Sequence, residues 1–307
     1  MNSSVVKRNV AFKSQGKTLA GDLYLPEGYD ADKKYTAVVV SGSWTTVKEQ
    51  MAGTYARRLA ESGFITLAYD PRGFGGSQGD VMYYESPDMK IEDIISAVDY
   101  LESLEEVEKI AGFGVCAAAG YTLVAASKDQ RIKAVATAAS WIHDAEAVKV
   151  FYGGEEGVAQ KIAAAQAAKA KFEATGEVEY IQAISTTDET AAMFGPYDYY
   201  LNPQRGAIKQ WSADKFAVMT WEDWLTYDPR ATAKDLTAPT LMIHSDGAVL
   251  PEYTKVYFDE ISTEDKELIW VETDILPSPF HQFNFYDQEE EVSLVIENVS
   301  KWFNTKL

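Results

Sequence analysis

The sequence predicts an α/β fold in which a mostly parallel sheet of about eight strands is flanked by helices. Short apolar runs rich in β-branched residues alternate with segments of helical period along most of the 307-residue chain. Hydrophobic residues make up 46% of the chain and charged residues 24%, which is typical of a globular protein and excludes disorder or a coiled coil. The alternation stops once, so we predict a core of residues 1–142 and 233–307 and an inserted helical cap of residues 143–232.

The chain opens with two strands and then alternates. Residues 5–13 and 18–25 each alternate in polarity and are expected to pair as an antiparallel hairpin. The continuous apolar run at 36–40 suits a strand that is buried on both faces. A helix over 47–62 and a strand over 64–69 follow.

The middle of the core repeats this pattern. Apolar residues recur every three or four positions over 90–103, which predicts an amphipathic helix. A strand over 109–115, a helix over 117–128 and a strand over 132–139 come next. After the cap, the alternation resumes with predicted strands at 240–244 and 266–272 and predicted helices at 252–261 and 289–303.

The first and second parts of the predicted cap differ in amino-acid composition. Residues 155–175 are rich in alanine and favour a helix. Residues 194–227 are rich in aromatic side chains, which either pack the cap on the core or form a wall that faces the substrate; both roles can hold at once.

Cys116, the single cysteine, lies between a predicted strand and a predicted helix in the sequence KIAGFGVCAAAG. Small residues two positions before and after it, Gly114 and Ala118, match a nucleophile elbow, because larger side chains there would collide with the strand or the helix. The amino end of a helix favours a thiolate at this point. A buried structural thiol is the alternative.

This segment resembles the nucleophile elbow of α/β-hydrolases, and a cysteine at its apex resembles the dienelactone hydrolase branch. The turn at 70–79, DPRGFGGSQG, is similar to the D-x-R-G-x-G-x-S-x-G turn after the fourth strand of many such enzymes, where its role is structural. It lacks the Lys-Ser/Thr ending of a phosphate-binding loop and the spacing of the dinucleotide fingerprint, so a nucleotide site is not predicted.

The resemblance implies a triad with Cys116 as nucleophile, Asp246 as acid and His281 as base, in the chain order of the fold. His281 follows the last predicted strand. His143 and His244 are the other candidate bases, the latter more typical of a structural role. Asp246 lies one residue nearer its strand than the common spacing, so Asp144 is the alternative acid.

The same resemblance implies an oxyanion hole made by backbone N–H groups. One donor is Ala117, directly after the nucleophile. The other is Ser43 or Trp44, in the turn after the third strand. For substrate contacts we expect Trp141, Trp221, Trp224 and Phe280.

These residues predict a hydrolase that cleaves a carboxylic ester, lactone or thioester through a thioacyl-enzyme intermediate. An acyltransferase on the same scaffold and a non-catalytic ligand-binding protein of this fold are the alternatives. The expected partner is a small-molecule acyl substrate.

The net charge of −19 argues against nucleic-acid binding, because an acidic surface repels phosphates. The three histidines lack metal-ligand spacing, so neither a metal nor another cofactor is expected. With no apolar run long enough to span a membrane and no signal-peptide pattern, we expect a cytoplasmic protein without membrane contact. The sequence does not determine the oligomeric state, and a homodimer is compatible with it.

Overall fold

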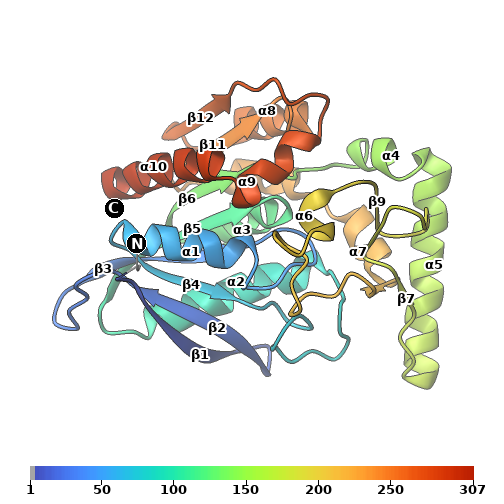
Figure 1. Cartoon of the computed structure of the whole chain (residues 1–307), viewed down its shortest axis with the longest axis horizontal. Coiled ribbons are helices and arrows are strands. Elements are labelled where there is room, and N and C mark those ends of the chain that lie inside the picture. The colour runs from blue at the N-terminus through green and yellow to red at the C-terminus, as the bar shows by residue number, and fades with distance from the viewer. Residues whose placement is uncertain (1–3) are drawn as a thin grey trace.

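The computed structural model describes residues 4–307 and is built around an eight-stranded sheet (Figure 1). The strands follow the order β1-β2-β4-β3-β5-β6-β11-β12. β1 and β2 form the predicted antiparallel hairpin, β2 is also antiparallel to β4, and the remaining pairs are parallel. The sheet consists of β1 (Val6–Ser14), β2 (Lys17–Leu25), β3 (Tyr35–Ser41), β4 (Ile65–Tyr69), β5 (Val107–Val115), β6 (Ile132–Ala138), β11 (Thr240–Ser245) and β12 (Lys266–Val271). The predicted fold class is confirmed.

Helices pack on both faces of this sheet. The long ones are α1 (Met51–Glu61), α2 (Pro87–Glu102), α3 (Ala117–Lys128), α8 (Pro251–Glu260) and α10 (Glu289–Lys306). α1 packs beside α10, and α2 beside α3. The central strands are mostly apolar because both of their faces are covered; all of β4 is buried. Within residues 4–307, no helix has both the length and the apolar character needed to cross a membrane.

Two helix starts differ from the sequence prediction, each for a local reason. α1 begins at Met51 rather than at 47, since the Gln50 side chain accepts the N–H of Val47 and holds the preceding residues in a turn. α2 begins before residue 90, because the Ser86 hydroxyl accepts the N–H of Met89 and Pro87 occupies the first turn.

The segment between β6 and β11 lies at one end of the molecule, on the right of Figure 1, with α5 farthest from the sheet. It contains α4 (Ala147–Phe151), α5 (Gly154–Thr175), β7 (Tyr180–Ile181), β8 (Ile184–Ser185), β9 (Met193–Phe194), α6 (Asp198–Leu201), β10 (Phe216–Ala217), α7 (Thr220–Thr226) and the 3-10 helix η1 (Pro229–Asp235). β7 pairs with β10 and β8 with β9; the sequence did not predict these strands because two residues show no periodicity. The exact limits of the cap stay a prediction, since η1 crosses the expected boundary at 232.

Candidate active site at the amino end of helix α3

Cys116 lies at a sharp turn between β5 and α3. Its backbone has φ 59° and ψ −122°, a strained conformation of the kind that the sequence motif predicts. Gly114 is required here, because a Cβ on it would lie 2.3 Å from the backbone oxygen of Ala118. The turn leaves the Cys116 side chain 6% exposed at the base of a pocket.

Four hydrogen-bond donors meet at the sulfur of Cys116. They are the backbone N–H groups of Trp44 and Ala117, the hydroxyl of Tyr286 and the side-chain amide of Gln282. Burial raises the pKa of the Cys116 thiol, and these hydrogen bonds offset only part of that effect. Burial therefore disfavours the thiolate form of Cys116, which the amino end of α3 was expected to stabilise.

The two amides at the sulfur belong to residues that the sequence analysis named for an oxyanion hole, and that role stays a prediction. Ala117 was one predicted donor. Of the two alternatives for the other, Trp44 directs its N–H to Cys116, whereas the Ser43 N–H points to the Met51 sulfur at 3.4 Å and the Ser43 hydroxyl contacts Tyr200 at 2.6 Å.

His281 does not lie against the sulfur, in contrast to the prediction that it is the base. Its Nδ1 is 2.7 Å from the Ser245 hydroxyl and its Nε2 is 2.9 Å from Glu291 Oε1, so both ring nitrogens are engaged elsewhere. The backbone at this position is held close to the loop after β11. The His281 N–H donates to the Gly247 oxygen at 3.0 Å, and a Cβ on Gly247 would lie 2.7 Å from that of His281. The ring points toward α10, where Glu291 lies.

Asp246 is exposed, and within residues 4–307 it makes no hydrogen bond or ion pair with His281. The alternative acid, Asp144, accepts backbone N–H groups of Glu146 and Ala147 and pairs with Arg230 at 3.1 Å. The predicted Cys116–His281–Asp246 arrangement is thus not assembled in this geometry.

The other two histidines are also held away from the sulfur. His143 Nδ1 accepts the Trp141 indole N–H at 2.9 Å, and burial lowers its pKa to about 4. His244 Nε2 lies 2.8 Å from the Val249 oxygen, and burial lowers its pKa to about 3. Both rings are neutral at physiological pH.

Gln282, which the sequence analysis did not single out, is the residue of this loop that reaches Cys116. Its Nε2 donates to the Ala139 oxygen at 2.7 Å, and its Oε1 accepts the Val249 N–H at 3.0 Å. Gln282 lies in the 3-10 helix η2 (Phe280–Phe283), which runs into α9 (Asn284–Asp287). The four-residue spacing of Gln282 and Tyr286 is the sequence signal that could have identified both, since it places them on one face of a helical turn.

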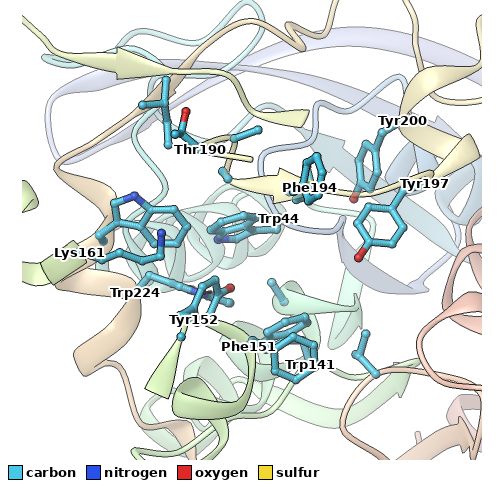
Figure 2. A pocket seen from close by; sticks show the side chains of 18 of the residues that line it. Trp44, Trp141, Phe151, Tyr152, Lys161, Thr190, Phe194, Tyr197, Tyr200 and Trp224 are labelled. Carbon is cyan, nitrogen blue, oxygen red and sulfur yellow. Dashed lines mark hydrogen bonds between the residues drawn. The ribbon is translucent and has the colours of Figure 1, made fainter. Parts of the chain in front are cut away.

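The pocket that Cys116 lines has a volume of about 730 Å³ and is rich in aromatic side chains (Figure 2). Trp141, Trp221 and Trp224 line it, and their contact with a substrate stays a prediction. Phe280 does not; it is 43% exposed and stands outside the pocket wall. In residues 4–307, no group of three or more His, Cys, Asp or Glu side chains could hold a metal ion.

Residues 15–271 match the X-Pro dipeptidyl-peptidase (S15) family. The chain belongs to this family. Its α/β-hydrolase fold agrees with the resemblance seen in the sequence. Peptidases of the S15 family use serine as the nucleophile, so the role of Cys116 as nucleophile stays a prediction. The expected dienelactone hydrolase branch is supported only at the level of the fold, by a TM-score of 0.56 and 14% identity with the enzyme from Anabaena variabilis.

Three relatives cover the chain to different extents. The uncharacterized protein YcjY of Escherichia coli is 31% identical over 94% of this chain and 95% of its own length. The structure of the hypothetical protein PA2218 of Pseudomonas aeruginosa covers 100% of this chain and 97% of its own, with 27% identity and a TM-score of 0.84. In a comparison of sequences, the polyketide transferase GrgF of Penicillium is 29% identical over 46% of this chain and 47% of its own length. In a comparison of structures, GrgF has a TM-score of 0.79 and 21% identity, covering 98% of this chain and 99% of its own.

Proposed function

We propose that this S15-family protein takes an apolar acyl group from an ester, lactone or thioester onto Cys116 and passes it to an acceptor. The observation that carries the proposal is the convergence of the Trp44 and Ala117 N–H groups on a sulfur at the base of an aromatic pocket. Donors placed in this way stabilise the negative charge that develops on a carbonyl oxygen under attack.

In the first step, the Cys116 sulfur forms a bond to the acyl carbon and the bond from that carbon to the leaving oxygen or sulfur breaks. The thiol proton moves to the leaving atom. The Tyr286 hydroxyl, which contacts the sulfur, is the group placed to relay it. The product is a thioester on Cys116 plus a free alcohol or thiol; opening a lactone leaves both groups on one product.

The fate of this thioester separates transfer from hydrolysis. Water is a poor nucleophile and needs a general base, which typically contributes a factor of about 10²–10⁴ in rate. Gln282 is the side chain of this loop that contacts the sulfur, and an amide cannot accept a proton at neutral pH. We therefore favour transfer to an amine or thiol over hydrolysis, because these acceptors are stronger nucleophiles than water or an alcohol. The acceptor atom bonds to the acyl carbon, the bond from that carbon to the Cys116 sulfur breaks, and the acceptor's proton passes to the sulfur. His281 and Asp246 have no part in this reaction. The name of the GrgF relative, a polyketide transferase, agrees with this preference.

A non-catalytic binding protein is the second candidate. It is favoured by the raised pKa of the Cys116 thiol, since a protonated thiol is a weak nucleophile. In that case, the pocket would hold an acyl compound without forming a bond to it.

The two candidates differ in whether a covalent adduct forms. We would incubate the protein with an aryl thioester of an apolar acid and follow intact mass. We expect one acyl adduct per chain, located on Cys116, persisting after the substrate is removed and discharged when a small thiol or amine is added.

The matched control is Cys116→Ala, which should form no adduct while keeping the thermal stability of the parent. If ligand binds to both proteins and the parent never gains mass, acyl transfer is excluded and the binding protein is the correct interpretation. If the adduct is lost to water as fast as it forms, the protein is a hydrolase.

A further inference from the structure

Lys161 stands in the wall of the aromatic pocket without an ionic partner. Among residues 4–307, it is the sole lysine or arginine that lines this pocket. Its ammonium lies 4.7 Å from the centroid of the Trp221 ring, and across residues 4–307 it makes no salt bridge or hydrogen bond. Neighbouring lysines on the same helix do have partners: Lys169 pairs with Glu222 and Asp223, and Lys171 pairs with Glu177.

Helix α5 is built so that this lysine reaches the pocket. Gly157, Gln160, Lys161 and Ala164 all line it and recur at helical spacing, so they share one face of the helix. Lys161 is the one residue with a long charged side chain among these four.

The surroundings leave the positive charge poorly compensated. Partial burial lowers the pKa of Lys161, and desolvation is the sole cause, with no carboxylate acting against it. Glu179 and Glu189 also line the pocket, but both are exposed and neither contacts the ammonium. The contact with Trp221 supplies a cation–π interaction, which stabilises a cation less well than an anion would in an apolar site.

Lys161 and the reacting sulfur are separated by indole rings. The Trp44 N–H points to Cys116, the Trp44 ring lies 6.0 Å from that of Trp221 between centroids, and Lys161 lies against Trp221. In Figure 2, Lys161 and Trp224 lie on the left of the pocket and Tyr197 and Tyr200 on the right, with Trp44 between them. The pocket therefore offers an acyl site at one place, an ammonium at another and aromatic surface in between.

We propose that the pocket selects acyl compounds that carry a carboxylate at the end remote from the reacting carbonyl, and that Lys161 binds this carboxylate. The inference rests on the proposed function for the identity of the reacting end. The substrate class is then an ester or thioester of a long-chain dicarboxylic acid, whose apolar chain lies along the indole rings.

The test measures binding, so that it does not depend on acyl transfer. The two probes are unreactive amides: the monoamide of a long-chain dicarboxylic acid, which keeps one carboxylate, and the corresponding diamide, which is neutral. We would determine both dissociation constants by calorimetry for the parent, Lys161→Met, Lys161→Arg and the control Lys171→Met, a lysine of α5 that does not line the pocket.

We expect the parent and Lys171→Met to bind the monoamide at least tenfold more tightly than the diamide. Lys161→Met should lose this preference while its affinity for the diamide stays the same, and Lys161→Arg should retain most of it. An unchanged preference in Lys161→Met, a parent that binds the diamide as well as the monoamide, or no binding of either probe would overturn the proposal. A Lys161-dependent preference without any adduct on Cys116 would refute acyl transfer and leave the carboxylate site standing.

Discussion

Gln282 and His281 are adjacent in the sequence, but their side chains point to different parts of the molecule. Gln282 contacts the sulfur of Cys116, whereas His281 bridges Ser245 and Glu291. A shift of one position along the turn thus decides whether an amide or an imidazole meets the thiol. Sequence reasoning assigned the histidine to this place because a thiol nucleophile usually needs a base.

We predict that Gln282→His shortens the lifetime of the acyl adduct on Cys116 by at least about tenfold, because an imidazole at this place can activate water. Intact mass recorded after removal of the substrate gives the lifetime. Gln282→Asn, which keeps an amide, is the matched control and should not accelerate the loss. Equal lifetimes in Gln282→His and the parent would show that the absent base does not limit deacylation.

For His281→Ala we predict a loss of stability instead of a loss of chemistry. Two buried hydrogen bonds disappear and leave Ser245 and Glu291 without these partners, at a cost of about 1–3 kcal/mol in the free energy of unfolding. Urea denaturation measures this cost. At a temperature where the variant is folded, its rate of adduct formation should stay within a few-fold of the parent; a fall of several orders of magnitude would restore His281 as the base.

The pH dependence of thiol alkylation should also reflect the buried sulfur. Because folding raises the pKa of Cys116, the thiolate fraction at any pH near neutrality is smaller than in the unfolded chain. The iodoacetamide rate should therefore rise with pH and reach its midpoint above that of the urea-unfolded protein, which is about 8.5. The single cysteine makes intact mass a direct measurement. A midpoint below the unfolded value would mean that the helix end and the four donors outweigh burial.

At the scale of elements, the junction of β5 with α3 was predictable because its requirements are local. A strand, a tight turn and a helix follow one another within a few residues, and small side chains are needed where their backbones come close. Short strands such as β7–β10 were not predictable, since their pairing depends on segments that only the folded chain brings together.

The close approach at this junction predicts a large effect for a small substitution. In Gly114→Ala, the new methyl group would meet the Ala118 oxygen at 2.3 Å, a backbone atom that cannot turn away. We expect a loss of about 2–4 kcal/mol in the free energy of unfolding, measured with urea. Gly176→Ala, at a helix end with open space but with φ 74°, should cost only the backbone strain of about 1 kcal/mol; a comparable cost for both would remove the steric explanation.

On the scale of the whole molecule, the pocket is formed between the sheet core and the segment inserted after β6. Core residue Trp44 packs against Phe216, Trp221 and Trp224 of the insertion. On the other side, Arg205 ties the insertion to α9 by two hydrogen bonds to Asp287, at 2.6 and 2.8 Å, and by one to the Phe283 oxygen. This link holds the helical turn that carries Gln282 and Tyr286.

Arg205→Lys should weaken that link although it keeps the charge, because an ammonium cannot reproduce the two-pronged contact with Asp287. We expect a loss of about 1–2 kcal/mol in the free energy of unfolding and weaker binding of neutral amide probes to the pocket. Denaturation and calorimetry measure the two effects. Arg57→Lys, at an exposed pair with Glu61, is the matched control and should change neither.

The sequence by itself determined the α/β class, the succession of the strands of the large sheet, and the strained turn at Cys116 with Ala117 as a neighbouring donor. These features depend on periodicity and on contacts between residues a few positions apart, which a sequence displays directly. Only the tertiary structure decided that Gln282 and Tyr286 meet the sulfur, that His281 turns to Glu291, and that Lys161 stands unpaired in the pocket. Each of these depends on how a loop or helix is rotated against distant parts of the chain, and rotation by a single residue changes which side chain faces the site.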